Sequence, residues 1–151
     1  MIGLKRGTVK LIEHQDEWRG EAEKAIESLK GLLAGVAVDI QHVGSTAVPS
    51  IHAKPILDVV VGVRKLEDIL AYKAVLEQSG VVFRGEDVKG QLLFVMGDFE
   101  KDVRTHHIHV VEWNGSAWKN YINFRDYLNA FPEKARMYDA CKQRLASRFP
   151  D

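Results

Sequence analysis

The stretch HVGSTAVPSIHAKPILDVVVGV, residues 42–63, decides how this chain folds, because it joins two segments with the character of β-strands. Residues 36–43 alternate in polarity over their second half, which is typical of a half-buried strand. Residues 56–63 are β-branched and almost wholly apolar, which predicts a strand buried on both faces of a sheet. Pro49 and Pro55 exclude a regular helix between the two strands. The stretch therefore predicts two strands joined by an irregular segment.

Amphipathic patterns on either side of this stretch predict helices. Apolar residues recur at helical spacing in four segments, residues 17–34, 66–79, 117–130 and 132–149. Asp16 suits an N-cap, Gly35 and Gly80 suit helix ends, and Pro132 suits the first turn of the last helix. Each expected helix is long enough to cover part of a sheet.

Three further short strands are expected at residues 81–84, 91–96 and 103–113. The resulting order lacks the regular alternation of strand and helix that is typical of a doubly wound sheet. It predicts an α+β fold, with a mixed or antiparallel sheet flanked by helices that lie on one side. The length of 151 residues and the absence of repeats or linkers predict a single domain over residues 1–151.

The composition is that of a globular protein, with 46 % apolar and 28 % charged residues. Lys plus Arg and Asp plus Glu both number 21, so the net charge is zero. This balance argues against a protein that grips nucleic acid mainly through its phosphates, although it permits a local basic pocket. The single cysteine, Cys141, favours a reducing compartment, and no apolar run has the length of a signal peptide or membrane span. We therefore expect a cytoplasmic protein with no membrane association; its oligomeric state is not indicated.

The turn that follows the first strand has the features of a phosphate-binding site. Gly44 lets the backbone approach a ligand closely, and successive backbone amides in such a turn bind anions. Ser45 and Thr46 add hydroxyl donors, and Lys54 adds a mobile positive charge. Asp58 then enters on the apolar strand, where a carboxylate is costly unless it binds a cation or accepts hydrogen bonds. Phosphate donors beside such a carboxylate indicate a nucleotide bound with Mg²⁺ or a similar ion.

Two histidines extend this hypothesis to other metals. His107 and His109 stand at i and i+2 of an expected strand, so both side chains face the same way. If this strand lies beside the strand of Asp58, one carboxylate and two imidazoles meet, a set that suits Zn²⁺, Mn²⁺ or Fe²⁺ better than Mg²⁺. The side chains of Arg104, His106 and Glu112 should face the other way unless a bulge intervenes.

Gly-Ser, followed after twelve residues by an Asp on an apolar strand, resembles the opening signature of DNA-polymerase-β-type nucleotidyltransferases. The full string of residues 42–63 resembles the signature of the GrpB family, a nucleotidyltransferase-fold family of largely unassigned activity. The resemblance extends over residues 8–148, through segments at 14–18, 107–111, 123–128 and 138–146. It implies a nucleotidyltransferase-like fold and a nucleotide or another phosphorylated small molecule as ligand.

The chain departs from these patterns at three positions. Metal-dependent members of the wider superfamily carry a second carboxylate two residues after the first, where this chain has Val60. Ser50 replaces the usual glycine, and the chain stops at Asp151, where relatives usually continue. Two-metal transfer generally uses two or three carboxylates to hold ions about 3.5–4 Å apart, so the single Asp58 leaves the inherited chemistry open.

The leading hypothesis is a nucleotidyltransferase-fold protein that binds a nucleotide with Mg²⁺ or Mn²⁺, with Zn²⁺ as the alternative ion. Its expected phosphate ligands are Gly44, Ser45, Thr46, His107, His109 and Arg125, its metal ligands Asp58, His107 and His109, and its catalytic residues Asp58, Lys54 and Arg125. In the alternative in which protonated His107 and His109 hold phosphate while Asp58 holds Mg²⁺, Arg125 would act as a bidentate phosphate clamp. Asp126 would orient one of these cations or supply a further carboxylate.

Two alternatives stay open. One is a non-catalytic module that binds a phosphorylated ligand or assists a partner enzyme, which the resemblance supports because relatives of the GrpB domain also occur fused to dephospho-CoA kinase. The other is a metal-dependent hydrolase that uses Asp58, His107 and His109.

Overall fold

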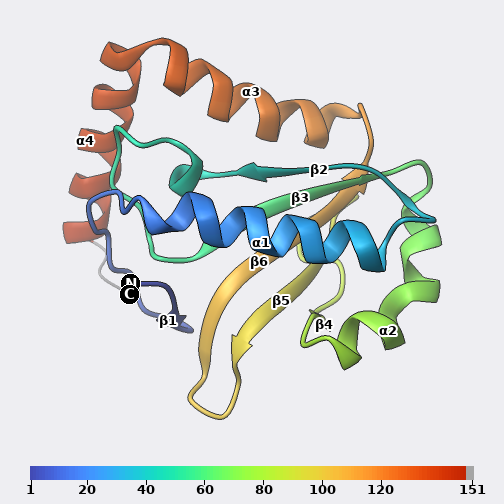
Figure 1. The fold of residues 1–151 in the computed structure, drawn as a ribbon. Coiled ribbons are helices and arrows are strands. Elements are labelled where there is room, and N and C mark those ends of the chain that lie inside the picture. Colours follow the sequence, from blue (N-terminus) through green and yellow to red (C-terminus); the bar gives the residue numbers. More distant parts are fainter. Residues whose placement is uncertain (149–151) are drawn as a thin grey trace.

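The computed structural model describes residues 1–148, and its centre is one mixed sheet with the strand order β2-β3-β6-β5-β4 (Figure 1). The strands are β1 Leu4–Lys5, β2 Ala37–Val43, β3 Leu57–Val63, β4 Val82–Phe83, β5 Leu92–Asp98 and β6 Val103–Glu112. β3 and β6 run parallel, and all other neighbours are antiparallel. The predicted α+β fold is therefore confirmed, and the sheet is mixed.

The helices are α1 Glu17–Leu32, α2 Lys73–Gln78, α3 Ser116–Ala130 and α4 Pro132–Arg148, with short 3₁₀ helices η1 Ser45–Ala47 and η2 Leu66–Tyr72. α1, α3 and α4 occupy the predicted segments, although the expected end of α4 at Phe149 lies outside the described residues. The single helix predicted over 66–79 is instead η2 followed by α2. Asp16 precedes α1 but makes no side-chain cap hydrogen bond.

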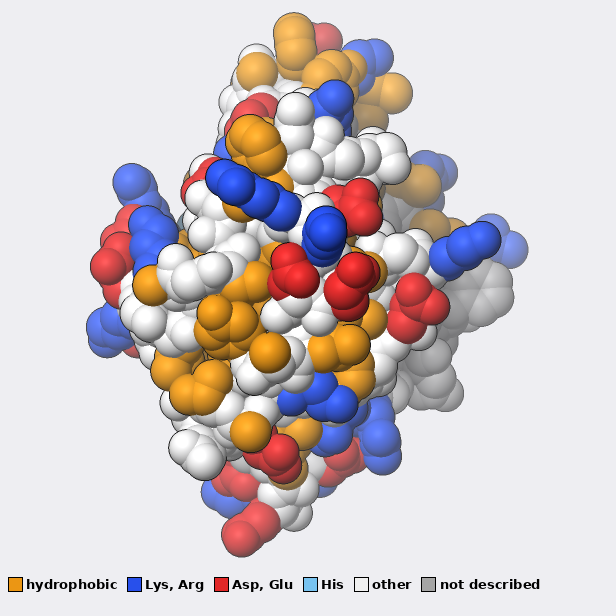
Figure 2. All heavy atoms as spheres, turned by 90° about the vertical axis from the view of Figure 1, so that its right-hand side faces the viewer, with side chains coloured by type: hydrophobic (Ala, Val, Ile, Leu, Met, Phe, Trp, Pro, Cys, Tyr) orange, Lys and Arg blue, Asp and Glu red, His pale blue; other side chains and the backbone are white. Residues whose placement is uncertain are grey.

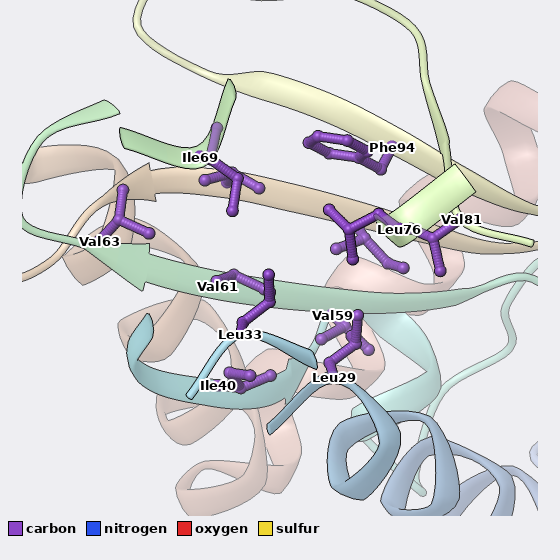
Figure 3. Close-up of a cluster of buried hydrophobic side chains, with 12 residues drawn as sticks. Leu29, Leu33, Ile40, Val59, Val61, Val63, Ile69, Leu76, Val81 and Phe94 are labelled. Carbon is purple, nitrogen blue, oxygen red and sulfur yellow. The ribbon is translucent and has the colours of Figure 1, made fainter. Parts of the chain in front are cut away.

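The main core lies between the sheet and α1, η2 and α2. It is built from buried side chains that Figure 3 shows around β3, namely Val59, Val61, Val63, Leu29, Leu33, Ile69 and Leu76. On the opposite face, Val60 and Val111 pack against Trp118 of α3. The expectation that helices lie on one side is therefore wrong. The physical reason is that β3 is apolar on both faces, so each face needs its own cover.

β1 was not expected from the sequence, because two residues carry no periodic pattern. It pairs with the start of β6, where Leu4 lies opposite Arg104. β3 meets β6 only from His106 onward, so β1 occupies the neighbouring position along the first residues of β6. The amide of Gly3 donates to the Pro55 carbonyl at 2.7 Å, which fixes this segment at the start of β3.

A bulge interrupts the pairing of β5 with β6. Met96 lies opposite His106 and Gly97 lies opposite Arg104, so Thr105 has no opposite residue. A Cβ atom on Gly97 would overlap the carbonyl oxygen of Val103, so the bulge requires glycine there. The extra residue changes the side-chain phase, and Arg104 lines the same cavity as His107 instead of facing away.

On the side of the molecule that lies at the right of Figure 1, the surface carries charges of both signs. Figure 2 shows Lys and Arg interspersed there with Asp and Glu, among small hydrophobic patches. Within residues 1–148, none of the helices has the length and apolar character needed to cross a bilayer.

Candidate functional site

Asp58, His107 and His109 come together on two neighbouring strands. β3 and β6 pair in parallel with Asp58 opposite His107 and Val60 opposite His109, so the three polar side chains share one face. His109 Nε2 lies 2.8 Å from Asp58 Oδ1, and His107 Nδ1 lies 3.9 Å from the same oxygen. The strand adjacency on which the metal hypothesis depended is therefore present.

These three residues fit one metal ion of a particular kind. One ligand atom from each lies within 4.8 Å of the other two, and the set combines one carboxylate with two imidazoles. Burial lowers the pKa of His107, and the Asp58 charge opposes this shift, so the ring favours the neutral form that binds metals. Val60, where a second carboxylate would stand, is fully buried. The donor set fits a single Mn²⁺, Fe²⁺ or Zn²⁺ ion better than a pair of Mg²⁺ ions.

Gly44 packs directly against the carboxylate of Asp58. Its φ angle is +74°, and a Cβ atom there would lie 2.6 Å from Asp58 Oδ2. Val43, the residue before it, pairs with Asp58 across β2 and β3. The turn and the carboxylate are thus held together by strand pairing and by the absence of a side chain at Gly44.

Ser45 and Thr46 face different partners. The Ser45 hydroxyl accepts a hydrogen bond from Lys142 Nζ at 2.7 Å and lies at the edge of two cavities. Thr46 is buried, and its hydroxyl lies 2.8 Å from His42 Nε2. Burial lowers the pKa of His42 to about 4, so the ring that shares this hydrogen bond with Thr46 is neutral at pH 7. Ser45 is consequently the better placed of the two hydroxyls for a phosphate.

The first cavity, of about 330 Å³, is strongly cationic. Asp58, His107, Ser45 and the predicted Lys54 line it. Four further cations that were not expected there complete its wall, namely Lys5, Arg6, Arg104 and Lys142. The family-like segment at residues 138–146 contains Lys142 and was the available signal for that residue. No local pattern distinguished the other three.

The second cavity, of about 510 Å³, meets the first at Ser45 and Asp58 and has an aromatic wall. Tyr121, Phe124 and Tyr138 line it together with the polar side chains Lys89, Gln91, Ser116 and Asn120. The Tyr121 ring lies 5.1 Å from the His109 ring, and its hydroxyl donates to Gln91 Oε1 at 2.7 Å. Burial raises the pKa of Tyr121 to about 12, so it stays a neutral donor.

Arg125 is not brought together with Asp58. Its guanidinium donates to Gln41 Oε1 at 2.8 Å and to the His42 carbonyl at 3.0 Å, which ties α3 to the edge strand β2. Asp126 is exposed and accepts from Arg125 Nε at 2.9 Å. Arg125 lines a different hollow, shared with His42 and Thr46. Its expected part as a phosphate clamp stays a prediction without geometric support.

A family model described as GrpB protein matches residues 8–151. The chain is 36 % identical over 154 residues to the glutamate-rich protein GrpB of Alkalihalophilus pseudofirmus, covering 100 % of this chain and 88 % of that protein. It is 33 % identical over 144 residues to the UPF0157 protein YqkA of Bacillus subtilis, covering 95 % of this chain but 41 % of that protein. The chain thus spans most of one relative and less than half of the other.

Among solved structures, the conserved protein GrpB from Enterococcus faecalis superposes with a TM-score of 0.84 at 30 % identity, over 94 % of this chain and 86 % of that one. The Cid1 poly(U) polymerase with MgGTP bound superposes with a TM-score of 0.54 at 16 % identity, over 78 % of this chain and 39 % of that one. The second likeness shows the fold alone. It confirms the nucleotidyltransferase-like architecture predicted from residues 44–58.

Proposed function

The chain belongs to the GrpB family, and from that membership and its fold we propose that it binds a nucleotide beside one divalent metal ion. One observation carries this proposal. The Gly44–Ser45 turn touches Asp58 at the point where a cationic cavity and an aromatic-walled cavity meet. A nucleotide has the matching chemistry, because its phosphates are anionic and its base is a flat ring.

Each part of the site has a separate task in this proposal. Asp58, His107 and His109 would hold the ion, which supplies positive charge to phosphate oxygens when bound. The Ser45 hydroxyl and the Gly44 backbone line the same cavity as Asp58 and would orient a phosphate there. Lys54 would neutralise phosphate charge from the exposed side of the cavity.

The aromatic-walled cavity would hold the nucleoside. Tyr121 and Phe124 offer ring surfaces for stacking, and Gln91 and Asn120 offer amide groups that hydrogen-bond to the edge of a base. Gln91 lies in the loop before β5 and the other three residues lie on α3, so the nucleoside would bind between this loop and the helix.

Isothermal titration calorimetry with ATP and UTP, with Mn²⁺ and with EDTA, tests this proposal. We expect binding that requires the metal and that weakens at least tenfold, about 1.4 kcal/mol, in Asp58→Asn. Asp126→Asn is the matched control, because Asp126 is exposed and lies in neither cavity. Equal nucleotide affinities of the wild type and Asp58→Asn would show that Asp58 is not part of the binding site.

The bound nucleotide could serve nucleotidyl transfer, and the second candidate is a non-catalytic module that binds a phosphorylated ligand or assists a partner enzyme. The single carboxylate favours the module, since Val60 offers no second metal ligand. In nucleotidyl transfer, an acceptor hydroxyl attacks the α-phosphorus, its proton leaves, and pyrophosphate departs. Pyrophosphate release from bound nucleotide that is lost in Asp58→Asn would establish transfer. Metal-coupled binding without release would establish the module, and a bound transition metal with phosphoester hydrolysis would favour the hydrolase alternative.

A further inference from the structure

Positive charges from four separate parts of the chain converge on the cavity beside Asp58. Lys5 and Arg6 come from β1 and the residue after it, Lys54 from the segment between β2 and β3, Arg104 from β6 and Lys142 from α4. Among residues 1–148, Asp58 is the one acidic side chain in the same wall. In a chain of zero net charge, such a local excess is a specific feature and not a consequence of composition.

Four of the five cations in this cavity lack an acidic partner among the described residues. Only Arg6 lies within ion-pair distance of a carboxylate, Asp102 at 3.8 Å, and both of these side chains are exposed. Lys142 is half-buried, and its Nζ donates to the neutral Ser45 hydroxyl. Burial, followed by the Lys54 charge, lowers the pKa of Lys142. Removal of the Lys142 ammonium from water carries a cost that an anionic ligand in the cavity would offset, whereas Lys5, Arg6 and Lys54 are exposed.

Two irregular features of the sheet bring arginine and lysine into this wall. The bulge at Thr105 turns Arg104 toward the cavity, and the short β1 carries Lys5 to the same place. The bulge also requires Gly97, which has no room for a side chain. A planar guanidinium is suited to contact two phosphate oxygens at once.

The amount of charge indicates the length of the anion. A phosphate group carries about −1.5 to −2 charges at pH 7. One such group would leave about half of the net positive charge of these five cations and one carboxylate uncompensated. Two or three linked phosphates would balance them, and the volume of about 330 Å³ lies within the usual range of ligand pockets.

We propose that this cavity is a condensed-phosphate subsite, which binds a chain of two or three phosphates without a metal ion of its own. Arg104 and Lys142 supply the charge that a second metal ion supplies where a site has more carboxylates. The assignment of this subsite to the tail of a nucleotide rests on the function proposed above. The binding of condensed phosphate by the cations does not depend on it.

Calorimetric titration with inorganic tripolyphosphate and with orthophosphate, both in EDTA at low salt, tests this subsite. We expect tripolyphosphate to bind and orthophosphate to bind at least roughly tenfold more weakly, since it meets fewer of the cations. Arg104→Gln and Lys142→Gln should each weaken tripolyphosphate binding roughly tenfold, the usual size of a lost charged hydrogen bond. Circular dichroism melts identify a variant that does not fold, and the other variant then decides.

The controls distinguish a specific binding site from non-specific attraction of tripolyphosphate to positive charge. Arg84→Gln removes an exposed charge that lies over the Phe99 ring and outside both cavities, and Lys134→Gln removes an exposed charge of α4. Both should leave tripolyphosphate affinity unchanged. Binding that requires Mn²⁺, or equal losses in Arg104→Gln and Arg84→Gln, would overturn the proposal.

Asp58→Asn distinguishes this inference from the proposed function, because the two predict opposite effects. Removing the one negative charge of the cavity should strengthen tripolyphosphate binding in EDTA, whereas it should abolish metal-coupled nucleotide binding. If nucleotides fail to bind with metal while tripolyphosphate binds in EDTA, the subsite stands and the nucleotide function falls. If nucleotides bind with metal and Arg104→Gln changes nothing, the subsite falls alone.

Discussion

Two constraints require a glycine at position 44. Its φ of +74° strains any residue with a side chain, and a Cβ atom would also meet the Asp58 carboxylate. Gly90 has a similar φ of +82° but open space around its Cα, so it carries the first constraint alone. Because the ψ of Gly44 is −173°, its backbone also lies in a region open almost only to glycine, so Gly90→Ala measures a positive φ in open space and Gly44→Ala measures backbone strain together with the close approach to Asp58.

We expect Gly44→Ala to lower the free energy of unfolding by about 2–4 kcal/mol, because strain and displacement of Asp58 add together. Gly90→Ala should cost about 1 kcal/mol from strain alone. Urea unfolding followed by circular dichroism measures both values. Equal losses in the two variants would show that the contact between Gly44 and Asp58 contributes nothing to stability.

At the scale of elements, α3 and β2 are joined through Arg125. The guanidinium bonds to Gln41 and to the backbone of His42, both on the edge strand. This arrangement differs from the phosphate clamp that the sequence suggested, and a substitution separates the two roles. The edge of β2 would lose its tie to α3 if the side chain were shortened and uncharged.

We expect Arg125→Gln to lower the free energy of unfolding by about 1–3 kcal/mol, the usual contribution of hydrogen bonds to a charged group. Nucleotide affinity with Mn²⁺ should stay unchanged, because Arg125 lines neither cavity beside Asp58. Chemical denaturation and calorimetry on the same preparation measure both quantities. Lost nucleotide binding with unaltered stability would restore the clamp hypothesis.

At the scale of the whole molecule, folding lowers the pKa of three histidines. Burial lowers the pKa of His42, His106 and His107, and for His42 it outweighs the opposing Asp58 charge to give a value of about 4. Between about pH 4 and 6.5 the unfolded chain therefore binds more protons than the folded chain. Stability should be independent of these groups above pH 6.5 and should fall as the pH is lowered through this window.

We expect the free energy of unfolding to fall between pH 7 and pH 5, with His42 contributing on the order of 1–2 kcal/mol. His42→Gln keeps a polar partner for Thr46 and cannot titrate, so its pH dependence should be flatter. Urea unfolding of both proteins at pH 7, 6 and 5 tests this. Parallel curves would mean that His42 titrates alike in the folded and unfolded chains.

The sequence by itself determined the residues that form most strands and helices, and it also singled out Asp58, His107 and His109 as candidate metal ligands. The spacing of His107 and His109 places them on one face of any strand, and only the adjacency to β3 remained to be supplied. The expectation of one domain over residues 1–151 stays a prediction. The expected cytoplasmic location and the ligand likewise await measurement.

Only the tertiary structure decided which side chains share the cavity with Asp58. Lys142 reaches Ser45 from 97 residues away, β1 has too few residues for a pattern, and a bulge reversed the expected direction of Arg104. The family-like segment at residues 123–128 had suggested Arg125 as a phosphate ligand. In the structure, Arg125 lines a different hollow. The physical reason is that side-chain alternation is a local property of the backbone. Strand partners, bulges and helix docking instead depend on contacts between distant segments.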